Sequence, residues 1–143
     1  MIGISGATGH LGRMTAQSVV ELGHDPGDLV LATRSPGAAA ELVPGAHARF
    51  ADFDQPESLL DAFHGVNRLL LISTDTVADR SRQHAAAIDA AVAAGVEHIV
   101  YTSMLSPAPP NPALIAESHW STEENLRASG VAFTILRCSL YSD

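Results

Sequence analysis

Short apolar runs alternate with longer segments of helical periodicity along the whole chain. Most of these runs end in glycine, proline or polar residues, which is typical of buried strands followed by turns. The runs predict six strands, at residues 1–4, 29–33, 46–50, 66–72, 96–101 and 131–136.

The segments between the runs carry apolar residues at helical spacing. The first segment ends at Gly23, a residue type that commonly follows the last turn of a helix. In the fourth segment we expect Ile88 and Val92 to face inward. The spacing predicts five helices, over residues 11–22, 38–42, 56–63, 80–95 and 113–128.

Strands that alternate with helices in this way are typical of a parallel sheet with right-handed crossovers. We therefore expect an α/β fold with a doubly wound parallel sheet, a Rossmann fold with strand order 3-2-1-4-5-6 and helices on both faces. A chain of 143 residues is long enough for one domain with a real core, and we expect that domain to span residues 1–143.

The first strand leads directly into a glycine-rich turn. Residues 2–12 read IGISGATGHLG, a G-x-x-G-x-x-G spacing at the junction with the first helix. Gly6 would allow a tight turn, Gly9 the close approach of a pyrophosphate, and Gly12 close packing of the helix on the sheet. Phosphates would bind the N–H groups at the helix start. The expected pyrophosphate-binding residues are Gly6, Ala7, Thr8, Gly9, His10 and Leu11.

Arg34 follows the second strand, at the position where dinucleotide folds contact the adenosine ribose. An acidic residue there binds the 2′-hydroxyl of NAD, whereas an arginine pairs with the 2′-phosphate of NADP. No acidic residue occurs between Arg34 and Glu41. We therefore expect NADP(H) to be preferred over NAD(H). The alternative is a solvated arginine at a strand end.

Two carboxylates and a phenylalanine follow the third strand. We expect Asp52 to accept a hydrogen bond from the adenine amino group. Phe53 would offer its backbone amide or its ring to the base. Asp54 precedes the helix predicted over residues 56–63, and we interpret it as the N-terminal cap of that helix.

Hydroxyl side chains follow the fourth and fifth strands. In the expected order the fourth strand lies beside the first, across the point where the order reverses. Ser73 and Thr74 are therefore expected to line the path toward the nicotinamide. Thr102 and Ser103 follow the fifth strand and are the expected polar contacts of the reacting substrate.

The first turn of the helix predicted over residues 80–95 holds Gln83 and His84. Both side chains could face the same crevice. For His84 we favour an exposed position at the start of a surface helix.

Composition restricts the classes of function. The net charge of −8 argues against a nucleic-acid or anionic-membrane surface, because both require a basic face. All eight basic residues are arginine, which excludes any mechanism that needs a lysine. The single cysteine, Cys138, is interpreted as a small buried hydrophobe and fits a reducing compartment.

No apolar run approaches the length of about 18 residues that a membrane span requires. Met1 begins a strand, which leaves no room for a signal peptide. We therefore expect a cytoplasmic protein that binds no metal, no nucleic acid and no membrane.

Seven stretches of the chain, in order, resemble one known family. They read ISGATGHLG, LATRSP, ADFDQPESL, LLLIST, AAGVEHIVYTS, HWSTEENLRASGVAFTILR and LYSD. On these motifs the chain is similar to the atypical short-chain dehydrogenases, in their NmrA-like branch, and most closely to the type 2 NAD(P)H:quinone oxidoreductases. The resemblance implies an NADP-binding fold and two-electron reduction of quinones.

Chains of this family continue beyond the YSD found here at residues 141–143 into a small substrate lobe. From the resemblance we expect the C-terminal substrate lobe to be missing from this chain. The resemblance also implies that residues 137–142, beginning with Arg137, border the nicotinamide end of the cofactor.

The chain departs from its relatives at the expected catalytic helix. Ordinary short-chain dehydrogenases use a Tyr-x-x-x-Lys pair, and these two places fall on Ile115 and His119. His119 and Glu123 lie four residues apart, on one helical face, and could form a hydrogen-bonded acid/base pair like that of the quinone reductase branch. For Glu123 we favour a structural or solvated carboxylate. For His119 the catalytic and structural interpretations both stay open.

A quinone accepts hydride directly at carbon, and solvent or a histidine of near-neutral pKa can supply the proton. We therefore expect an NADPH-binding oxidoreductase that transfers hydride to a quinone or similar small molecule. His119, Ser103 and Thr102 are the expected catalytic residues. The alternative is a non-catalytic NADP(H) redox sensor that changes its affinity for a protein partner. A nucleotide-sugar epimerase is disfavoured because its tyrosine is missing, and a homodimer is compatible with the favoured role.

Overall fold

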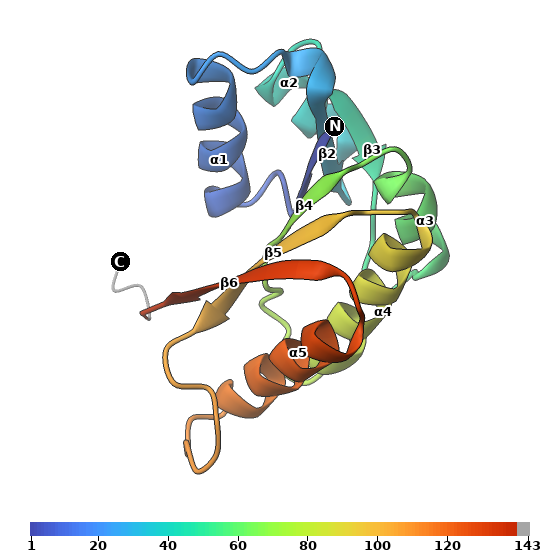
Figure 1. Cartoon of the computed structure of the whole chain (residues 1–143). Coiled ribbons are helices and arrows are strands. Elements are labelled where there is room, and N and C mark those ends of the chain that lie inside the picture. Colours follow the sequence, from blue (N-terminus) through green and yellow to red (C-terminus); the bar gives the residue numbers. More distant parts are fainter. Residues whose placement is uncertain (140–143) are drawn as a thin grey trace.

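Six parallel strands form one sheet in the computed structural model, which describes residues 1–139. The strands are β1 (Ile2–Ser5), β2 (Leu29–Thr33), β3 (His47–Phe50), β4 (Arg68–Leu71), β5 (His98–Met104) and β6 (Ala132–Cys138). Their order across the sheet is β3-β2-β1-β4-β5-β6, and all neighbouring pairs are parallel (Figure 1). The predicted doubly wound sheet and its strand order are confirmed.

Helices follow five of the strands and cover both faces of the sheet. They are α1 (His10–Glu21), α2 (Pro36–Leu42), α3 (Glu57–Phe63), α4 (Arg80–Ala93) and α5 (Ala116–Ala128), and a short 3-10 turn spans Pro26–Asp28. The helices α1 and α2 lie on one face, and α3, α4 and α5 lie on the other (Figure 1). Right-handed crossovers produce this arrangement.

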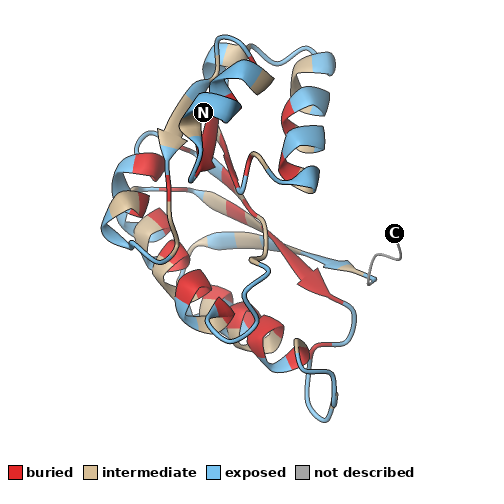
Figure 2. Ribbon diagram, turned by 180° about the vertical axis from the view of Figure 1, so that it is seen from behind, coloured by how far each residue is buried: buried red, intermediate tan, exposed pale blue. Residues whose placement is uncertain are grey.

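Each face of the sheet has its own hydrophobic core. The core under α1 and α2 contains Leu29 and Leu31, whereas the core under α3, α4 and α5 contains Val30 and Phe63. Successive residues of β2 therefore enter opposite cores, and the whole strand is buried. Burial on both faces explains why β2 is a continuous apolar run. Figure 2 shows buried residues along the central strands and exposed residues on the outer faces of the helices.

Three predicted boundaries differ from the structure in the last third of the chain. The helix α5 begins at Ala116 instead of residue 113, and Leu114 is 90% exposed before it. The strands β5 and β6 continue further than predicted because they pair residue by residue as far as Met104 and Cys138. Three predicted site residues, Thr102, Ser103 and Arg137, consequently lie within strands and not after them.

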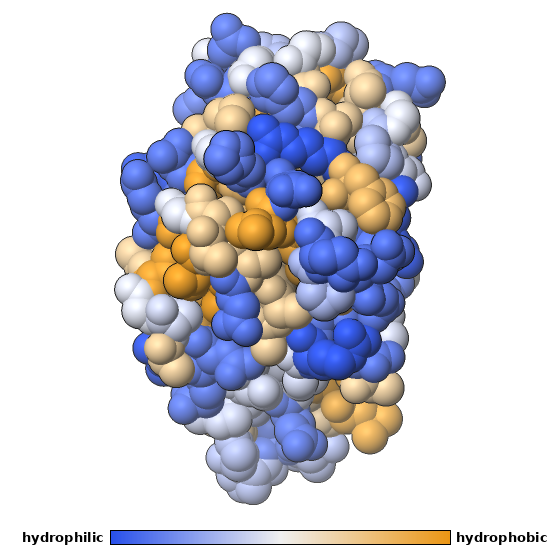
Figure 3. Space-filling view, turned by 90° about the vertical axis from the view of Figure 1, so that its right-hand side faces the viewer, coloured by the Kyte–Doolittle hydropathy of each residue, from blue (hydrophilic) through white to orange (hydrophobic). Residues whose placement is uncertain are grey.

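The predicted inward position of Val92 is wrong. Ile88 and Ala91 are buried in α4, but Val92 is 42% exposed, because one residue turns a helix by about 100° and carries Val92 off the buried face. Figure 3 shows the side of the molecule that carries α3 and α4, where apolar side chains gather between hydrophilic regions. No helix within residues 1–139 is both long and apolar enough to cross a membrane.

Candidate functional site

The glycine turn lies between β1 and α1, as the motif predicted. Gly6 has a φ of +60°, in the left-handed region that favours glycine. A Cβ atom at Gly12 would lie 2.3 Å from the carbonyl oxygen of Gly6 and 2.7 Å from Cα of Ala7, so no side chain fits where α1 meets the turn. The turn therefore has the close backbone packing that a dinucleotide-binding loop requires.

The first backbone N–H groups of α1 have no hydrogen-bond acceptor within the helix. Helical hydrogen bonding begins with the N–H of Arg13, which donates to the carbonyl of Gly9 at 2.9 Å. Unpaired amides and the positive end of the helix dipole suit an anion such as a phosphate. The amide of Ala7 is not one of them, because it donates to β2. Within residues 1–139, the open amides of α1 are those of His10, Leu11 and Gly12.

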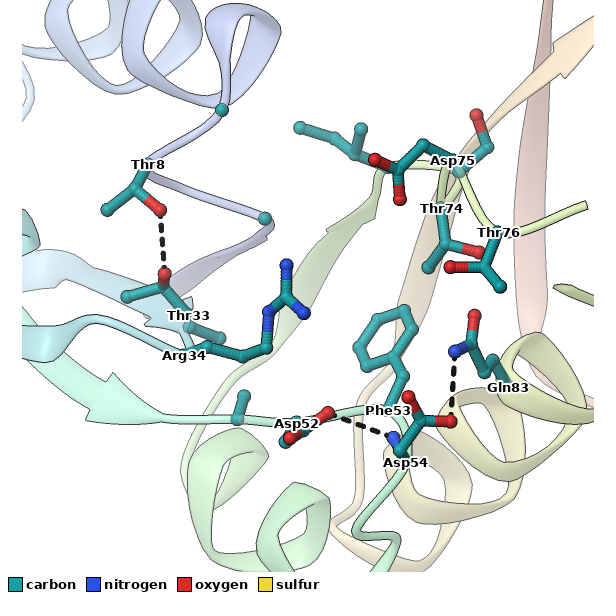
Figure 4. A pocket seen from close by; sticks show the side chains of 16 residues that line it. Thr8, Thr33, Arg34, Asp52, Phe53, Asp54, Thr74, Asp75, Thr76 and Gln83 are labelled. Carbon is teal, nitrogen blue, oxygen red and sulfur yellow. Dashed lines mark hydrogen bonds between the residues drawn. The ribbon is translucent and has the colours of Figure 1, made fainter. Parts of the chain in front are cut away.

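A cavity of about 420 Å³ opens at the C-terminal ends of β1, β2, β3 and β4 (Figure 4). It spans the point between β1 and β4 where the strand order reverses, which is where open α/β sheets bind ligands. Its volume is in the range of small-molecule sites. The predicted cofactor residues that line it are Gly6, Thr8, Gly9, Arg34, Asp52, Phe53, Ser73 and Thr74.

Arg34 extends into this cavity from the end of β2 (Figure 4). Its guanidinium forms no ion pair within residues 1–139, unlike those of Arg82, Arg127 and Arg137. Beside it, the hydroxyls of Thr8 and Thr33 lie 2.8 Å apart in a hydrogen bond that joins the glycine turn to β2. The cavity therefore contains a guanidinium that forms no ion pair within residues 1–139, together with Gly6, Thr8 and Gly9 of the glycine turn.

The interpretation of Asp54 as a helix cap is wrong. No side chain caps α3, and Pro56 occupies the N-cap position. The carboxylate of Asp54 instead accepts hydrogen bonds from Gln83 at 3.0 Å and from Arg82 at 2.7 Å, both in α4. The bonds from Gln83 and then Arg82 hold the pKa of Asp54 below its usual range. The carboxylate of Asp54 thus bonds side chains of α4, and not the backbone N–H groups at the start of α3.

Asp52 and Phe53 both line the cavity, as predicted, but the carboxylate of Asp52 is already engaged. Its two oxygens accept hydrogen bonds from the N–H of Asp54 at 3.0 Å and from the side-chain amide of Gln55 at 3.2 Å. The ring of Phe53 stands in the cavity between Arg34 and Gln83 (Figure 4). Phe53 therefore offers a flat apolar surface at the exit of β3.

Side chains hold the segment that leaves β4. The N–H of Ile72 donates to Oγ of Ser5 at 2.9 Å, and the N–H of Ser73 donates to Oγ1 of Thr102 at 2.9 Å. The two hydroxyls thus accept hydrogen bonds from the backbone N–H groups that directly follow the last residue of β4. Thr102 is buried and outside the cavity lining, so its hydroxyl supports the cavity wall at Ser73.

The main chain of Thr74 is held from α4. Its N–H donates to Nε2 of His84 at 3.1 Å, and its carbonyl accepts from Nε of Arg80 at 2.7 Å. The predicted exposed position of His84 is wrong, because the side chain is fully buried. Burial, reinforced by the charge of Arg80, lowers the pKa of His84 to about 3 and keeps the ring neutral. Its Nδ1 then donates to Oγ1 of Thr122 at 3.0 Å.

His119 and Glu123 do not form the predicted acid/base pair. Nδ1 of His119 lies 2.6 Å from the hydroxyl of Tyr101, a residue that the sequence analysis did not single out. Burial, with the charge of Arg80, lowers the pKa of His119 to about 4 instead of leaving it near neutral. Burial also raises the pKa of Tyr101. Both groups are neutral at pH 7, so His119 is a poor proton donor there.

Glu123 is fully buried and surrounded by donors. Its carboxylate accepts two hydrogen bonds from Arg137, at 2.7 and 3.0 Å, and one from Arg127 at 3.1 Å. The hydroxyl of Ser103 donates a fourth at 2.8 Å. Burial alone would raise the pKa of Glu123, but the bonds from Arg137 and Ser103 outweigh it and lower that pKa. Glu123 is therefore a structural carboxylate, the interpretation favoured above.

Several predicted site residues stand apart from the cavity lining. Ser103 is buried and bonded to Glu123, and Arg137 is bonded to the same carboxylate, so both belong to the contact between α5 and the sheet. Their cofactor and catalytic roles stay predictions. The predicted residues outside the lining are Ala7, His10, Leu11, Thr102, Ser103, His119 and Arg137.

The cavity lining also contains residues that were not predicted, among them Thr33, Asp75 and Thr76. The lining includes Gln83 as well, one of the two residues considered for the crevice. One feature of the sequence points to the contacts behind this wall. Gln83 and His84 are adjacent polar residues directly before an alanine-rich helical segment, where small apolar side chains are otherwise the rule.

Comparison with known proteins agrees with this geometry. The profile of the NAD(P)H-binding family matches residues 6–143. The chain is 40% identical over 144 residues to quinone oxidoreductase 2 of Escherichia coli strain K12, covering 100% of this chain and 50% of the relative. It resembles the NADP(H) complex of triphenylmethane reductase from Citrobacter sp. with a TM-score of 0.92 and 34% identity, over 99% of this chain and 50% of that one.

The NADPH complex of the NADPH-dependent quinone oxidoreductase from Escherichia coli gives a TM-score of 0.86 and 39% identity, over 96% of this chain and 48% of that one. The chain thus spans about half the length of the relatives it matches. The family match includes every residue that lines the cavity. The resemblance drawn from the motifs is confirmed, and the chain belongs to the NAD(P)H-binding family.

Proposed function

We propose that this chain binds NADPH in the cavity and forms the cofactor half of a reductase whose acceptor is a quinone or a similar small molecule. The observation that carries the proposal is one cavity lined both by the glycine turn that leads into α1 and by Arg34, whose guanidinium forms no ion pair within residues 1–139. The unpaired amides of His10, Leu11 and Gly12 follow directly after this turn. Together the amides and Arg34 suit a ligand that carries a diphosphate and a further phosphate.

The residues present fit this ligand. The amides of His10, Leu11 and Gly12 would hold the diphosphate, since a Cβ at Gly12 would fill the space between helix and turn. Arg34 would bind the 2′-phosphate as a charge-assisted pair and so favour NADPH over NADH. Phe53 would pack against the adenine, and Ser73 would line the path to the nicotinamide ring.

A bound nicotinamide would supply hydride, and the residues of this chain would supply orientation. Thr102, His84 and Arg80 fix the backbone of Ser73 and Thr74 through three hydrogen bonds just after β4. Such a fixed wall restricts where a ring can lie. His119 is neutral at pH 7, with its Nδ1 occupied by Tyr101, so protonation of the reduced acceptor would fall to solvent.

The relatives support the choice of reaction class. The chain shares 40% identity with a protein named quinone oxidoreductase 2 and 30% with the NAD(P)H azoreductase of Xenophilus azovorans. Both names describe reduction of a conjugated acceptor. A quinone needs no lysine and no tyrosine acid, which agrees with a chain that has no lysine and has Ile115 where the tyrosine would stand.

Two measurements test the proposal separately. Titration calorimetry of the 143-residue chain with NADPH tests binding, and we expect NADPH to bind more tightly than NADH. Oxidation of NADPH by the full gene product in the presence of benzoquinone tests the transfer, with the rate without benzoquinone as the reference. Absence of NADPH binding would reject the cofactor site. Binding without any stimulation by quinones would reject the acceptor class.

A redox sensor is the second candidate function. It is favoured by the burial of His119 against Tyr101, because a histidine whose pKa is lowered to about 4 is a poor proton donor at pH 7. A sensor would bind NADP⁺ and NADPH without turnover and with different affinities. Equal affinities for the oxidised and reduced cofactor would reject this role.

A further inference from the structure

The carboxamide of Gln83 has a fixed orientation in the cavity wall. Gln83 lies in the first turn of α4, is 4% exposed, and donates through Nε2 to the carboxylate of Asp54 at 3.0 Å. That carboxylate also accepts from Arg82, and both bonds keep its pKa low, so it is ionised and can only accept. The NH₂ group of Gln83 must therefore face Asp54, and its oxygen must face the other way.

The oxygen of Gln83 has no partner. Oε1 is buried and makes no hydrogen bond, and the same is true of Oγ1 of Thr74. Figure 4 shows the Gln83 oxygen directed away from Asp54, toward Thr74 and Thr76 on the opposite part of the wall. An unpaired buried acceptor is costly and is rare in folded proteins. Oε1 of Gln83 therefore calls for a donor, and the hydroxyl of Thr74 for a hydrogen-bond partner, that a ligand would bring.

We propose that Gln83 is a specificity-determining residue whose Oε1 accepts a hydrogen bond from the exocyclic amino group of adenine. The hydroxyl of Thr74 would donate to the neighbouring ring nitrogen. The inference rests on the proposed binding of NADPH in this cavity. It assigns to Gln83 the contact that the sequence analysis assigned to Asp52, and it places Thr74 at the adenine instead of on the path to the nicotinamide.

The position of Gln83 selects adenine over the other groups of the cofactor. Gln83 is bonded to Asp54, which follows Phe53 at the exit of β3, and these residues share one end of the cavity with Arg34 (Figure 4). Adenine and the 2′-phosphate are carried by the same ribose, so a base whose phosphate meets Arg34 lies at this end. Asp52 is less suited to the amino group, because both of its carboxylate oxygens already accept bonds from its own loop.

The wall must open slightly to admit the base. Both unpaired atoms are covered in the structure, so the edge of the base would enter between Thr74 and Gln83. The backbone of Ser73 and Thr74 is held by hydrogen bonds, so the opening would come from the side chain of Thr74 and from residues 75–79, which lie in no helix or strand. On entry, the amino group would donate to Oε1 of Gln83 and the hydroxyl of Thr74 would donate to the ring nitrogen.

The fixed carboxamide makes the contact selective. Hypoxanthine carries an oxygen where adenine carries the amino group, so it would place an acceptor against Oε1 of Gln83. Gln83 cannot turn its NH₂ group toward that oxygen, because its own oxygen would then face the carboxylate of Asp54. A site built to pair a donor rejects an analogue that lacks it.

The test compares NADP⁺ with nicotinamide hypoxanthine dinucleotide phosphate by titration calorimetry. We expect the wild-type chain to bind the hypoxanthine analogue at least about tenfold more weakly. Gln83→Leu should bind both nucleotides with nearly equal affinity. Asp54→Asn should also lose most of the preference, because an amide at residue 54 lets Gln83 turn. Gln17→Leu, an exposed change on α1 away from the cavity, is the matched control and should keep the wild-type ratio.

The ratio of the two affinities separates this proposal from a structural role, since a merely structural Gln83 would change stability and leave the ratio intact. Equal binding of both nucleotides by the wild-type chain would overturn the assignment and leave a buried water as the partner of Oε1. A preference that persists in Gln83→Leu would overturn it as well. Failure to bind either nucleotide would reject the NADPH site itself, which is a different result.

Discussion

His84 accepts a hydrogen bond from the backbone N–H of Thr74, 3.1 Å away, and thereby fixes the cavity wall from behind. The imidazole is fully buried and neutral, and its other nitrogen donates to Thr122 on α5. One side chain therefore connects the cavity wall, α4 and α5. Its removal should affect both stability and cofactor binding.

We expect His84→Phe to lower the free energy of unfolding by about 1–3 kcal/mol, the cost of leaving the buried Thr74 N–H unpaired. The variant should also bind NADPH more weakly, because the Thr74 wall loses its support. Urea denaturation and calorimetry measure the two effects. The exposed His24→Phe is the control and should match the wild-type chain. Unchanged stability in His84→Phe would show that this bond contributes nothing.

Stability should rise with pH between about 5 and 6.5 because two histidines are buried in the neutral form. The pKa values of His84 and His119 fall from 6.5 to about 3 and about 4 in the folded chain. In this pH window the unfolded chain binds protons that the folded chain does not. Each histidine should therefore add up to about 1.4 kcal/mol to the free energy of unfolding per pH unit.

Urea denaturation at a series of pH values measures this slope. The double variant His84→Gln/His119→Gln should flatten it between pH 5 and 6.5. The carboxylates of Asp54 and Glu123, whose pKa values are lowered, act in the same direction but below this window. A slope that survives in the double variant would assign the effect to other groups.

Replacing Glu123 with glutamine should destabilise the contact between α5 and β6. The buried carboxylate accepts both bonds from Arg137, and a neutral amide would lose the charge attraction and turn a donor toward the guanidinium. We expect a loss of about 1–3 kcal/mol, the cost of leaving buried polar groups unpaired. The exposed Glu124→Gln is the matched control. Equal thermal midpoints for the two variants would contradict the structural role of Glu123.

The strands could be predicted from the sequence because a strand that is buried on both faces is a short run of consecutive, mostly apolar residues. Residues 29–33 are apolar without alternation, and β2 has those bounds. The start of α5 was less predictable, because Leu114 has the right spacing for a helix but lies exposed before it. The spacing of apolar residues shows which positions a helix could bury, but it does not fix the residue at which the helix begins, and α5 begins three residues later than predicted.

The site shows the same division between local and distant contacts. Arg34 and Thr74 could be placed because a strand end in a parallel sheet has only one edge to occupy. The partner of His119 could not be found, because Tyr101 lies 18 residues away on another element and the helix offered Glu123 as the nearer choice. Similarly, no local pattern in the sequence indicates that the carboxylate of Asp54 bonds Gln83 on α4 instead of capping α3.

Arg34→Ala should remove the preference for NADPH over NADH. The guanidinium has no partner within residues 1–139, so its loss leaves no unpaired carboxylate and the fold should be unaffected. A charge-assisted pair contributes about 1.5–3 kcal/mol, so the NADPH affinity should fall roughly 10- to 100-fold while NADH binding stays similar. Calorimetry measures both. Arg68→Ala, at the opposite end of β4 from the cavity, controls for net charge.

Gly12→Ala should disrupt the phosphate-binding turn. The added Cβ would lie 2.3 Å from the carbonyl oxygen of Gly6 and 2.7 Å from Cα of Ala7, and both are backbone atoms that move only with the turn. We expect a stability loss of about 1–3 kcal/mol, typical of overpacking, together with loss of NADPH binding as α1 shifts from the turn.

Gly37→Ala, in α2, is the matched control, because nothing lies within 4 Å of its added Cβ. Alanine is the better helix former, so this variant should gain about 0.5–1 kcal/mol and bind NADPH as the wild-type chain does. Thermal denaturation and calorimetry of the two variants give the comparison. If Gly12→Ala behaved like Gly37→Ala, α1 would not need to touch the turn, and its open amides would have no fixed place from which to hold a diphosphate.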